Sequence, residues 1–157
     1  MTIELTDIEI YNLIQEEKHL PLNYYHKLAS FKLRQQHKEA ELTVNGGNGS
    51  RFKIVLRQNT INRLDFSVIL AYVKPNSNKL FRIRRYNGRS HHHTNKIEGN
   101  RFFDFHIHKA TERYQEIGLK EDAYADPCDR YNNLEEALIC LIDDCGFIVP
   151  GNQGKLF

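Results

Sequence analysis

The chain has 157 residues, a net charge of only +2 and a hydrophobic content of 40%, which together indicate a single globular domain. No apolar run approaches the roughly 18 residues that a membrane-spanning helix needs, and the N-terminus lacks the basic and apolar regions of a signal peptide. Three cysteines without C-x-x-C spacing argue against a disulfide framework or a structural zinc site. We therefore expect a cytoplasmic protein that does not contact a membrane.

The first predicted element is an amphipathic helix near the N-terminus. Thr6 and Glu9 have the spacing of a capping box, in which each side chain accepts from the main-chain N–H of the other residue. Apolar residues then recur at the spacing of one helix face, at Ile10, Leu13 and Ile14. We expect this helix to extend to about Lys18 and to end before Pro21.

Alternation of polar and apolar residues predicts a series of strands in the middle of the chain. The glycine-rich segment 46–49 is typical of a hairpin connection between two of them. The run 64–73 is more continuously apolar, which favours a central strand covered on both faces. The predicted strands span residues 28–34, 41–44, 52–56, 64–73, 80–86 and 102–109.

A second amphipathic helix is predicted near the C-terminus. It should begin at Asn132 or Asn133, carry acidic residues in its first turn and end at Gly146. The predicted fold class is therefore α+β, a meandering antiparallel sheet packed by an N-terminal and a C-terminal helix. We expect one domain over residues 1–149 and a loose tail over residues 150–157.

Positive charge and histidine are both concentrated in the segment from Lys79 to Lys109. It holds eight basic and two acidic residues, a net charge of +6, and both flanking ends of the chain are acidic. It also holds five of the eight histidines, namely His91, His92, His93, His106 and His108. Cations bind the phosphates of a polyanion, and imidazoles transfer protons near neutral pH. The segment therefore indicates a site for phosphate chemistry.

Two of these histidines are predicted to lie side by side on one strand face. In an extended conformation the apolar side chains of strand 102–109 point towards the core, so that His106 and His108 point outward together. His93 can approach them from the polar loop 87–100, which precedes this strand.

The main functional hypothesis is acid/base cleavage of RNA without any cofactor. Attack of a ribose 2′-hydroxyl on the neighbouring phosphate needs a proton acceptor, a proton donor and cations that stabilise the phosphorane. Arg82 and Arg84 are expected to share one face of strand 80–86. The proposed catalytic residues are His93, His106, His108 and Asn95, and the proposed phosphate-binding residues are Arg82, Arg84, Arg85 and Arg89.

Two alternatives remain open. In the first, His106 and His108 bind one divalent metal, such as zinc or manganese, together with His93 or His91. The spacing His106-x-His108-x-x-x-Glu112 resembles the first half of the cupin metal motif, but no histidine follows to supply the second half. In the second, the protein is a non-enzymatic nucleic-acid or protein adaptor whose aromatic residues stack on bases, with Tyr86, Phe102 and Tyr114 as candidates.

Three short motifs resemble an uncharacterised family of small bacterial domains. They are His93-Thr94-Asn95, His106-Ile107-His108 and Tyr124-Ala125-x-Pro127, which match the family's H-x-N, H-x-H and aromatic-Ala-x-Pro elements in order. Lys96 and Ile97 depart from the turn that usually follows H-x-N. The H-x-H strand more distantly resembles TumE-like toxins of toxin–antitoxin pairs. The resemblance implies a mobile-element or phage-defence protein, an RNA-cleaving toxin whose partners are RNA and a protein antitoxin.

Overall fold

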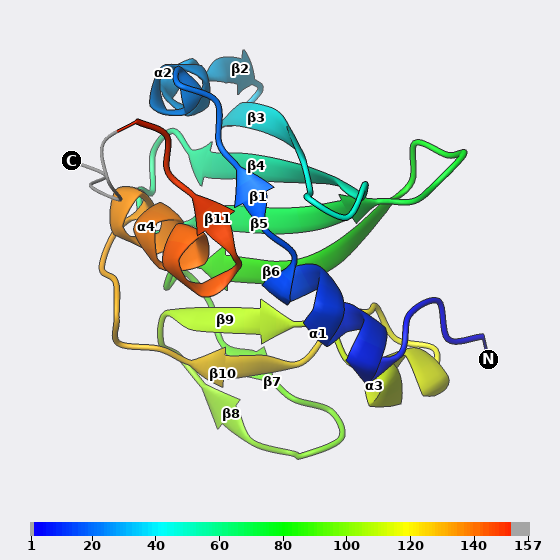
Figure 1. The fold of residues 1–157 in the computed structure, drawn as a ribbon. Helices are drawn as coiled ribbons and strands as arrows, with labels where there is room; N and C mark the ends of the chain where they lie inside the picture. The colour runs from blue at the N-terminus through cyan, green and yellow to red at the C-terminus, as the bar shows by residue number, and fades with distance from the viewer. Residues whose placement is uncertain (1, 152–157) are drawn as a thin grey trace.

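The computed structural model describes residues 2–151 and confirms the predicted α+β fold, in which helices near both ends of the chain accompany a large antiparallel sheet (Figure 1). The elements in chain order are α1 (Asp7–Gln15), β1 (Lys18–His19), α2 (Tyr24–Ala29), β2 (Lys32–Arg34), β3 (His37–Asn45), β4 (Arg51–Asn59), β5 (Phe66–Val73), β6 (Leu80–Asn87), β7 (His93–Thr94), β8 (Arg101–Phe102), β9 (His106–Lys109), α3 (Glu112–Glu116), β10 (Ala125–Pro127), α4 (Leu134–Asp144) and β11 (Phe147–Ile148).

The main sheet is an antiparallel meander that is interrupted once, between β6 and β9, by a separate hairpin. Within residues 2–151 it has seven strands in the spatial order β10-β9-β6-β5-β4-β3-β2, and all neighbouring strands are antiparallel. Between β6 and β9 the chain leaves the sheet to form the β7–β8 hairpin, a separate two-stranded unit near the lower end of Figure 1. This hairpin brings His93 back towards β9.

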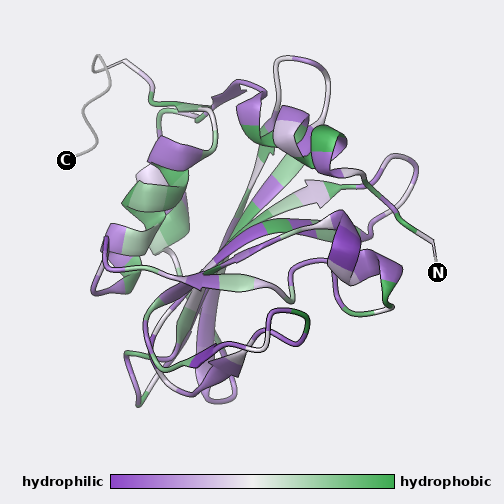
Figure 2. Ribbon diagram, turned by 90° about the horizontal axis from the view of Figure 1, so that it is seen from below, coloured by the Kyte–Doolittle hydropathy of each residue, from purple (hydrophilic) through white to green (hydrophobic). Residues whose placement is uncertain are grey.

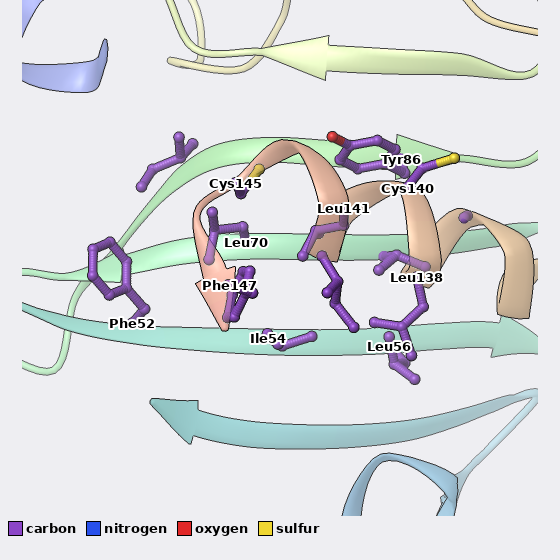
Figure 3. Packing of buried hydrophobic residues seen from close by; sticks show 14 of the residues in the cluster. Phe52, Ile54, Leu56, Leu70, Tyr86, Leu138, Cys140, Leu141, Cys145 and Phe147 are labelled. Atoms are coloured by element: carbon purple, nitrogen blue, oxygen red, sulfur yellow. The ribbon is translucent and has the colours of Figure 1, made fainter. Parts of the chain in front are cut away.

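The hydrophobic core lies between α4 and one face of the sheet. Leu138 and Leu141 of α4 pack with Ile54 of β4 and Leu70 of β5 (Figure 3), and burying each such side chain contributes roughly 1.5–3 kcal/mol. Figure 2 shows apolar and polar residues interspersed along the central strands. On the other face of β5, Ala71 is completely buried and Ile69 is partly exposed, so the predicted cover on both faces is present only in part.

Both helix starts that were predicted from capping residues are confirmed. The Thr6 hydroxyl accepts from the Glu9 N–H at 3.1 Å, and the Thr6 N–H donates to the Glu9 carboxylate at 2.9 Å. Asn133 Oδ1 accepts from the Glu136 N–H at 2.8 Å. The first helix ends at Gln15, earlier than predicted, because the chain then enters β1, which pairs in parallel with β11.

Lys18 joins the C-terminal ends of α1 and α4 from inside the core. Its side chain is completely buried, and its ammonium donates to the main-chain carbonyls of Leu13, Ile14, Glu16 and Cys145 at distances of 2.7–3.1 Å. The last carbonyls of a helix have no helical partner and lie at the negative end of its dipole. A buried cation there satisfies both helices at once, although burial lowers the pKa of Lys18 to about 8.

Two predicted strands differ from the structure. The start of strand 28–34 is the end of α2, because Tyr24 and Leu28, one helical turn apart, are both buried against the core. Strand 102–109 is interrupted at residues 103–105, so that β8 pairs with β7 while β9 pairs with β6 and β10. The short helix α3 was not predicted.

A β-bulge decides which side chains of β6 share a face. The pairing of β5 with β6 shifts between Leu70 and Ala71, so that Arg84 lies opposite Leu70 and Arg82 lies opposite Ala71. The expectation that Arg82 and Arg84 share a face is therefore wrong. Arg82 lies on the same face as Arg85, since both approach the carboxylate of Asp122, which follows α3.

None of the helices formed by residues 2–151 combines the length and the apolar composition needed to cross a membrane. Of the predicted tail at 150–157, residues 152–157 lie outside the described part of the chain, and Pro150 and Gly151 form a turn after β11.

Candidate metal centre

The structure brings His93, His106 and His108 together on the sheet face opposite α4. His106 and His108 lie on either side of Ile107, whose side chain belongs to the hydrophobic core, so they point to the other face of β9. His93 reaches them from β7. One ring nitrogen from each histidine lies within 4.8 Å of the other two, and the ring centroids are 4.9–5.4 Å apart.

The pair on β9 is buried, whereas the sequence predicted that it points outward. His106 is 2% exposed and His108 is 5% exposed, while His93 is half-buried. The β7–β8 hairpin supplies part of this cover, because the Phe102 ring lies 5.4 Å from His93 and 5.7 Å from His106 between centroids. The predicted alternation holds within β9, where Ile107 faces the core, but not at Phe103, which is exposed in the interruption of the strand. The sequence pattern does not show the hairpin that covers the two histidines.

Main-chain carbonyls fix the tautomers of the two buried histidines. His106 Nδ1 lies 2.8 Å from the carbonyl oxygen of Asp104, and His108 Nδ1 lies 2.7 Å from that of Asp122. A carbonyl oxygen only accepts, so each Nδ1 must carry the proton and donate. The lone pair of each neutral ring is therefore on Nε2.

Asn95 fixes the third tautomer. Asn95 is buried, its Oδ1 accepts from the Ala125 N–H at 2.9 Å, and its Nδ2 donates to the Ala125 carbonyl at 2.8 Å and to Asn100 Oδ1 at 3.1 Å. The main chain of Ala125 thus determines which end of the amide is the oxygen. His93 Nε2, 2.7 Å from Asn95 Oδ1, must donate to it, which leaves the His93 lone pair on Nδ1. Asn95, predicted to be catalytic, is a positioning residue in this arrangement.

The environment keeps the two buried imidazoles neutral. Burial lowers the pKa of His106 to about 4 and the pKa of His108 to about 2, and the positive charge of Arg85 contributes to both shifts. Neutral imidazoles with one oriented N–H and a lone pair on the other ring nitrogen are the ligand state that divalent metals bind. Within residues 2–151 no carboxylate or thiol joins this group, so it offers three neutral ligands.

Arg85 and Asp122 form the nearest charged pair. Arg85 lies directly opposite His108 in the pairing of β6 with β9, and such residues point to the same face. Its Nε donates to Asp122 Oδ2 at 2.9 Å. Because the Asp122 carbonyl also holds His108, one completely buried residue positions both the cation and the ligand.

The four predicted phosphate-binding arginines are divided among three places. Arg82 and Arg85 both approach Asp122 on the histidine face, at 3.3 Å and 2.9 Å. Arg84 lies on the opposite face, where burial acts to lower its pKa but Cys145, Tyr86 and Asp144 together raise it. Arg89 is exposed beyond the end of β6, with its guanidinium 5.3 Å from the centre of a phenylalanine ring.

Other candidates from the sequence lie away from the cluster or are covered. The carboxylate of Glu112, the acidic residue of the cupin-like spacing, accepts from the Asp7 N–H at 2.7 Å, and the Glu112 N–H donates to the Asp7 carboxylate at 2.9 Å, so it joins α3 to α1. Tyr86 and Tyr114 are completely buried and cannot stack on bases. His91, like its neighbour His92, is exposed and outside the group of three.

Sequence reasoning missed Asp122, and no local pattern singles it out. Its main-chain carbonyl accepts from His108, and its carboxylate binds Arg85 of β6, 37 residues earlier in the sequence. Ala125 was noticed only as part of the aromatic-Ala-x-Pro motif. Its two main-chain hydrogen bonds with the Asn95 side chain give that motif a physical role, because they attach the β7–β8 hairpin, which includes His93, to β10.

Fold and site together define an α+β protein with a cluster of three histidines, two of them buried, on the face of an antiparallel sheet opposite α4. Residues 5–147 match a family of unknown function, DUF6978, and the chain belongs to this family. This agrees with the resemblance to an uncharacterised domain family and carries no link to TumE-like toxins. Comparisons with curated proteins and with solved structures gave no match.

Proposed function

We propose that this protein is a metal-dependent hydrolase whose His93, His106 and His108 bind one divalent ion, with zinc as the best fit. The observation that carries the proposal is the orientation of the three rings. Each ring donates one N–H to a fixed oxygen, which leaves a lone pair on its other nitrogen, and one nitrogen of each ring lies within 4.8 Å of one nitrogen of each other ring.

Hydrolysis follows from the number of ligands. A structural zinc site usually has four protein ligands, whereas a catalytic site has three and leaves one position for water. Three neutral imidazoles leave the full charge of the ion to act on that water, whose pKa falls to about 7 in comparable sites. If the hydrogen bonds to the fixed oxygens are kept, His106 and His108 would bind the ion through Nε2 and His93 through Nδ1.

Metal-free cleavage of RNA is less well supported by this geometry. A general acid must be protonated near neutral pH, and the low pKa values of His106 and His108 leave both rings neutral there. Asn95, the fourth residue of that hypothesis, has its side-chain donors and acceptor occupied. Ribonuclease activity that survives complete removal of metal would restore this alternative.

Elemental analysis of protein purified without a histidine tag tests the metal centre. We expect about one equivalent of bound metal in the wild type and loss of most of it in His106→Ala or His108→Ala. The matched control is His91→Ala combined with His92→Ala, which removes two exposed imidazoles next to His93 and should leave the equivalent in place. Equal metal content in His108→Ala and the wild type would contradict the proposal.

Hydrolysis itself is tested on a phosphodiester such as bis(p-nitrophenyl) phosphate and on RNA. Turnover should disappear on chelation, return with zinc and be absent in His106→Ala, while the control double variant remains active. If the protein binds one equivalent of metal but hydrolyses neither substrate, the metal centre stands and the proposed hydrolysis of phosphate esters is refuted.

A further inference from the structure

The charge balance of the cluster requires an anionic ligand once a metal is present. Three neutral imidazoles leave the ion with a charge of +2, and Arg85 adds a further positive charge on the neighbouring strand. Asp122 supplies one negative charge and contacts both Arg85 and Arg82, and Arg82 also pairs with Glu121. The two carboxylates therefore balance the two arginines, and the charge of the ion is left unbalanced. A buried excess of positive charge is costly unless a counter-charge enters the site. The open coordination position is the place where that counter-charge can bind.

Arg85 is held in a position to bind the same anion. Its Nε is bonded to Asp122 Oδ2, which fixes the plane of the guanidinium. Neither of its terminal nitrogens has a hydrogen bond to any residue of the described chain, and a quarter of the side chain is exposed. Two parallel N–H donors of one guanidinium match two oxygens of a phosphate or a carboxylate.

Asp122 ties the arginine to the metal ligand. Through its main chain it orients His108, and through its side chain it holds Arg85. Its remaining oxygen, Oδ1, is buried and has no donor among residues 2–151. The two binding elements are therefore parts of one rigid unit.

We propose that the substrate of this centre is a phosphate ester, one of whose oxygens takes the open metal position while Arg85 binds the other non-bridging oxygens. This inference rests on the proposed function, because without the ion the site lacks the charge that selects an anion. Phosphate fits better than carboxylate because a tetrahedral group offers oxygens in two directions, towards the metal and towards the arginine.

Cobalt-loaded protein titrated with inorganic phosphate tests the inference. Co²⁺ replaces zinc at such sites, and its visible absorption changes when the open position is occupied. We expect phosphate to change the spectrum of the wild type, and Arg85→Gln to bind phosphate roughly tenfold or more weakly, as loss of a charge-assisted hydrogen bond predicts. Arg85→Lys should be intermediate, since it keeps the charge without the fork.

The matched control is Arg57→Gln on β4, an exposed arginine of the same sheet whose ion-pair partner is Glu39. It should bind cobalt and phosphate like the wild type. Equal phosphate affinity in Arg85→Gln and the wild type would overturn the inference, as would acetate binding as tightly as phosphate. If the wild type takes up no cobalt, the metal centre itself is refuted, and this outcome is visible before any phosphate is added. An Arg85→Gln variant that no longer binds cobalt would also count against the inference, because Arg85 would then be needed to position the metal-binding histidines rather than to bind phosphate.

Discussion

The metal-free protein should lose stability in mildly acidic solution because of His106 and His108. Burial lowers the pKa of His106 to about 4 and the pKa of His108 to about 2, from an ordinary value of 6.5. Below pH 6.5 the unfolded chain therefore binds more protons than the folded chain. The free energy of unfolding falls with pH throughout the interval from 6.5 down to the folded pKa values.

The expected magnitude is large for a domain of this size. Each buried histidine contributes up to about 1.4 kcal/mol per pH unit well below its unfolded pKa. Integrated from about pH 6.5 to about pH 5, the pair removes about 3 kcal/mol, out of a typical total stability of roughly 5–15 kcal/mol. Most carboxylates contribute little in this interval because they titrate below it.

Urea unfolding of chelator-treated protein at several pH values measures this dependence. His108→Gln should lose about half of it, because the glutamine side chain does not bind a proton in either state. His26→Gln, which changes an exposed histidine of α2, should keep all of it. The reasoning is refuted if the unfolding free energy of His108→Gln depends on pH as steeply as that of the wild type.

Three further predictions concern residues that position the fold and the site. Lys18→Met should lower the free energy of unfolding by about 3–5 kcal/mol in urea titrations, since it leaves buried carbonyls unpaired at two helix ends. Asn95→Ala should weaken metal binding by about 10–100-fold in a chelator competition, with the fold retained by circular dichroism, because His93 loses its hydrogen-bond partner. Gly88→Ala should cost more than about 2 kcal/mol, because a Cβ there would lie 1.9 Å from the Leu64 carbonyl oxygen; Gly47→Ala, with its nearest neighbour at 3.7 Å, is the control for thermal denaturation.

The features that sequence predicted best depend on residues close together in the chain. The capping box joins Thr6 to Glu9, and the cap at Asn133 acts on the next turn of its own helix, so both were readable from spacing alone. The same holds for the i, i+2 spacing of His106 and His108, which placed them on one face of β9. Fold class followed because such local signals determine the order of helices and strands.

The features that sequence could not predict depend on register or on distant contacts. The bulge that puts Arg82 and Arg84 on different faces is a property of the pairing of two strands, and neither strand carries a distinctive residue for it. The burial of the histidines results from a hairpin folding back over β9, and Asp122 acts through its carbonyl, a group that every residue has. Propensity and periodicity describe neither kind of contact.

The buried ammonium of Lys18 also constrains the order of events during protein synthesis. Its acceptor on Cys145 is 127 positions further along the chain, and the β1–β11 pairing spans a similar separation. The Lys18 contact with Cys145 and the β1–β11 pairing can form only after residues 145–148 have been synthesised. We expect a folding reaction dominated by long-range closure, slow for a protein of this size and dependent on chaperones while the sheet face that α4 will cover is still bare.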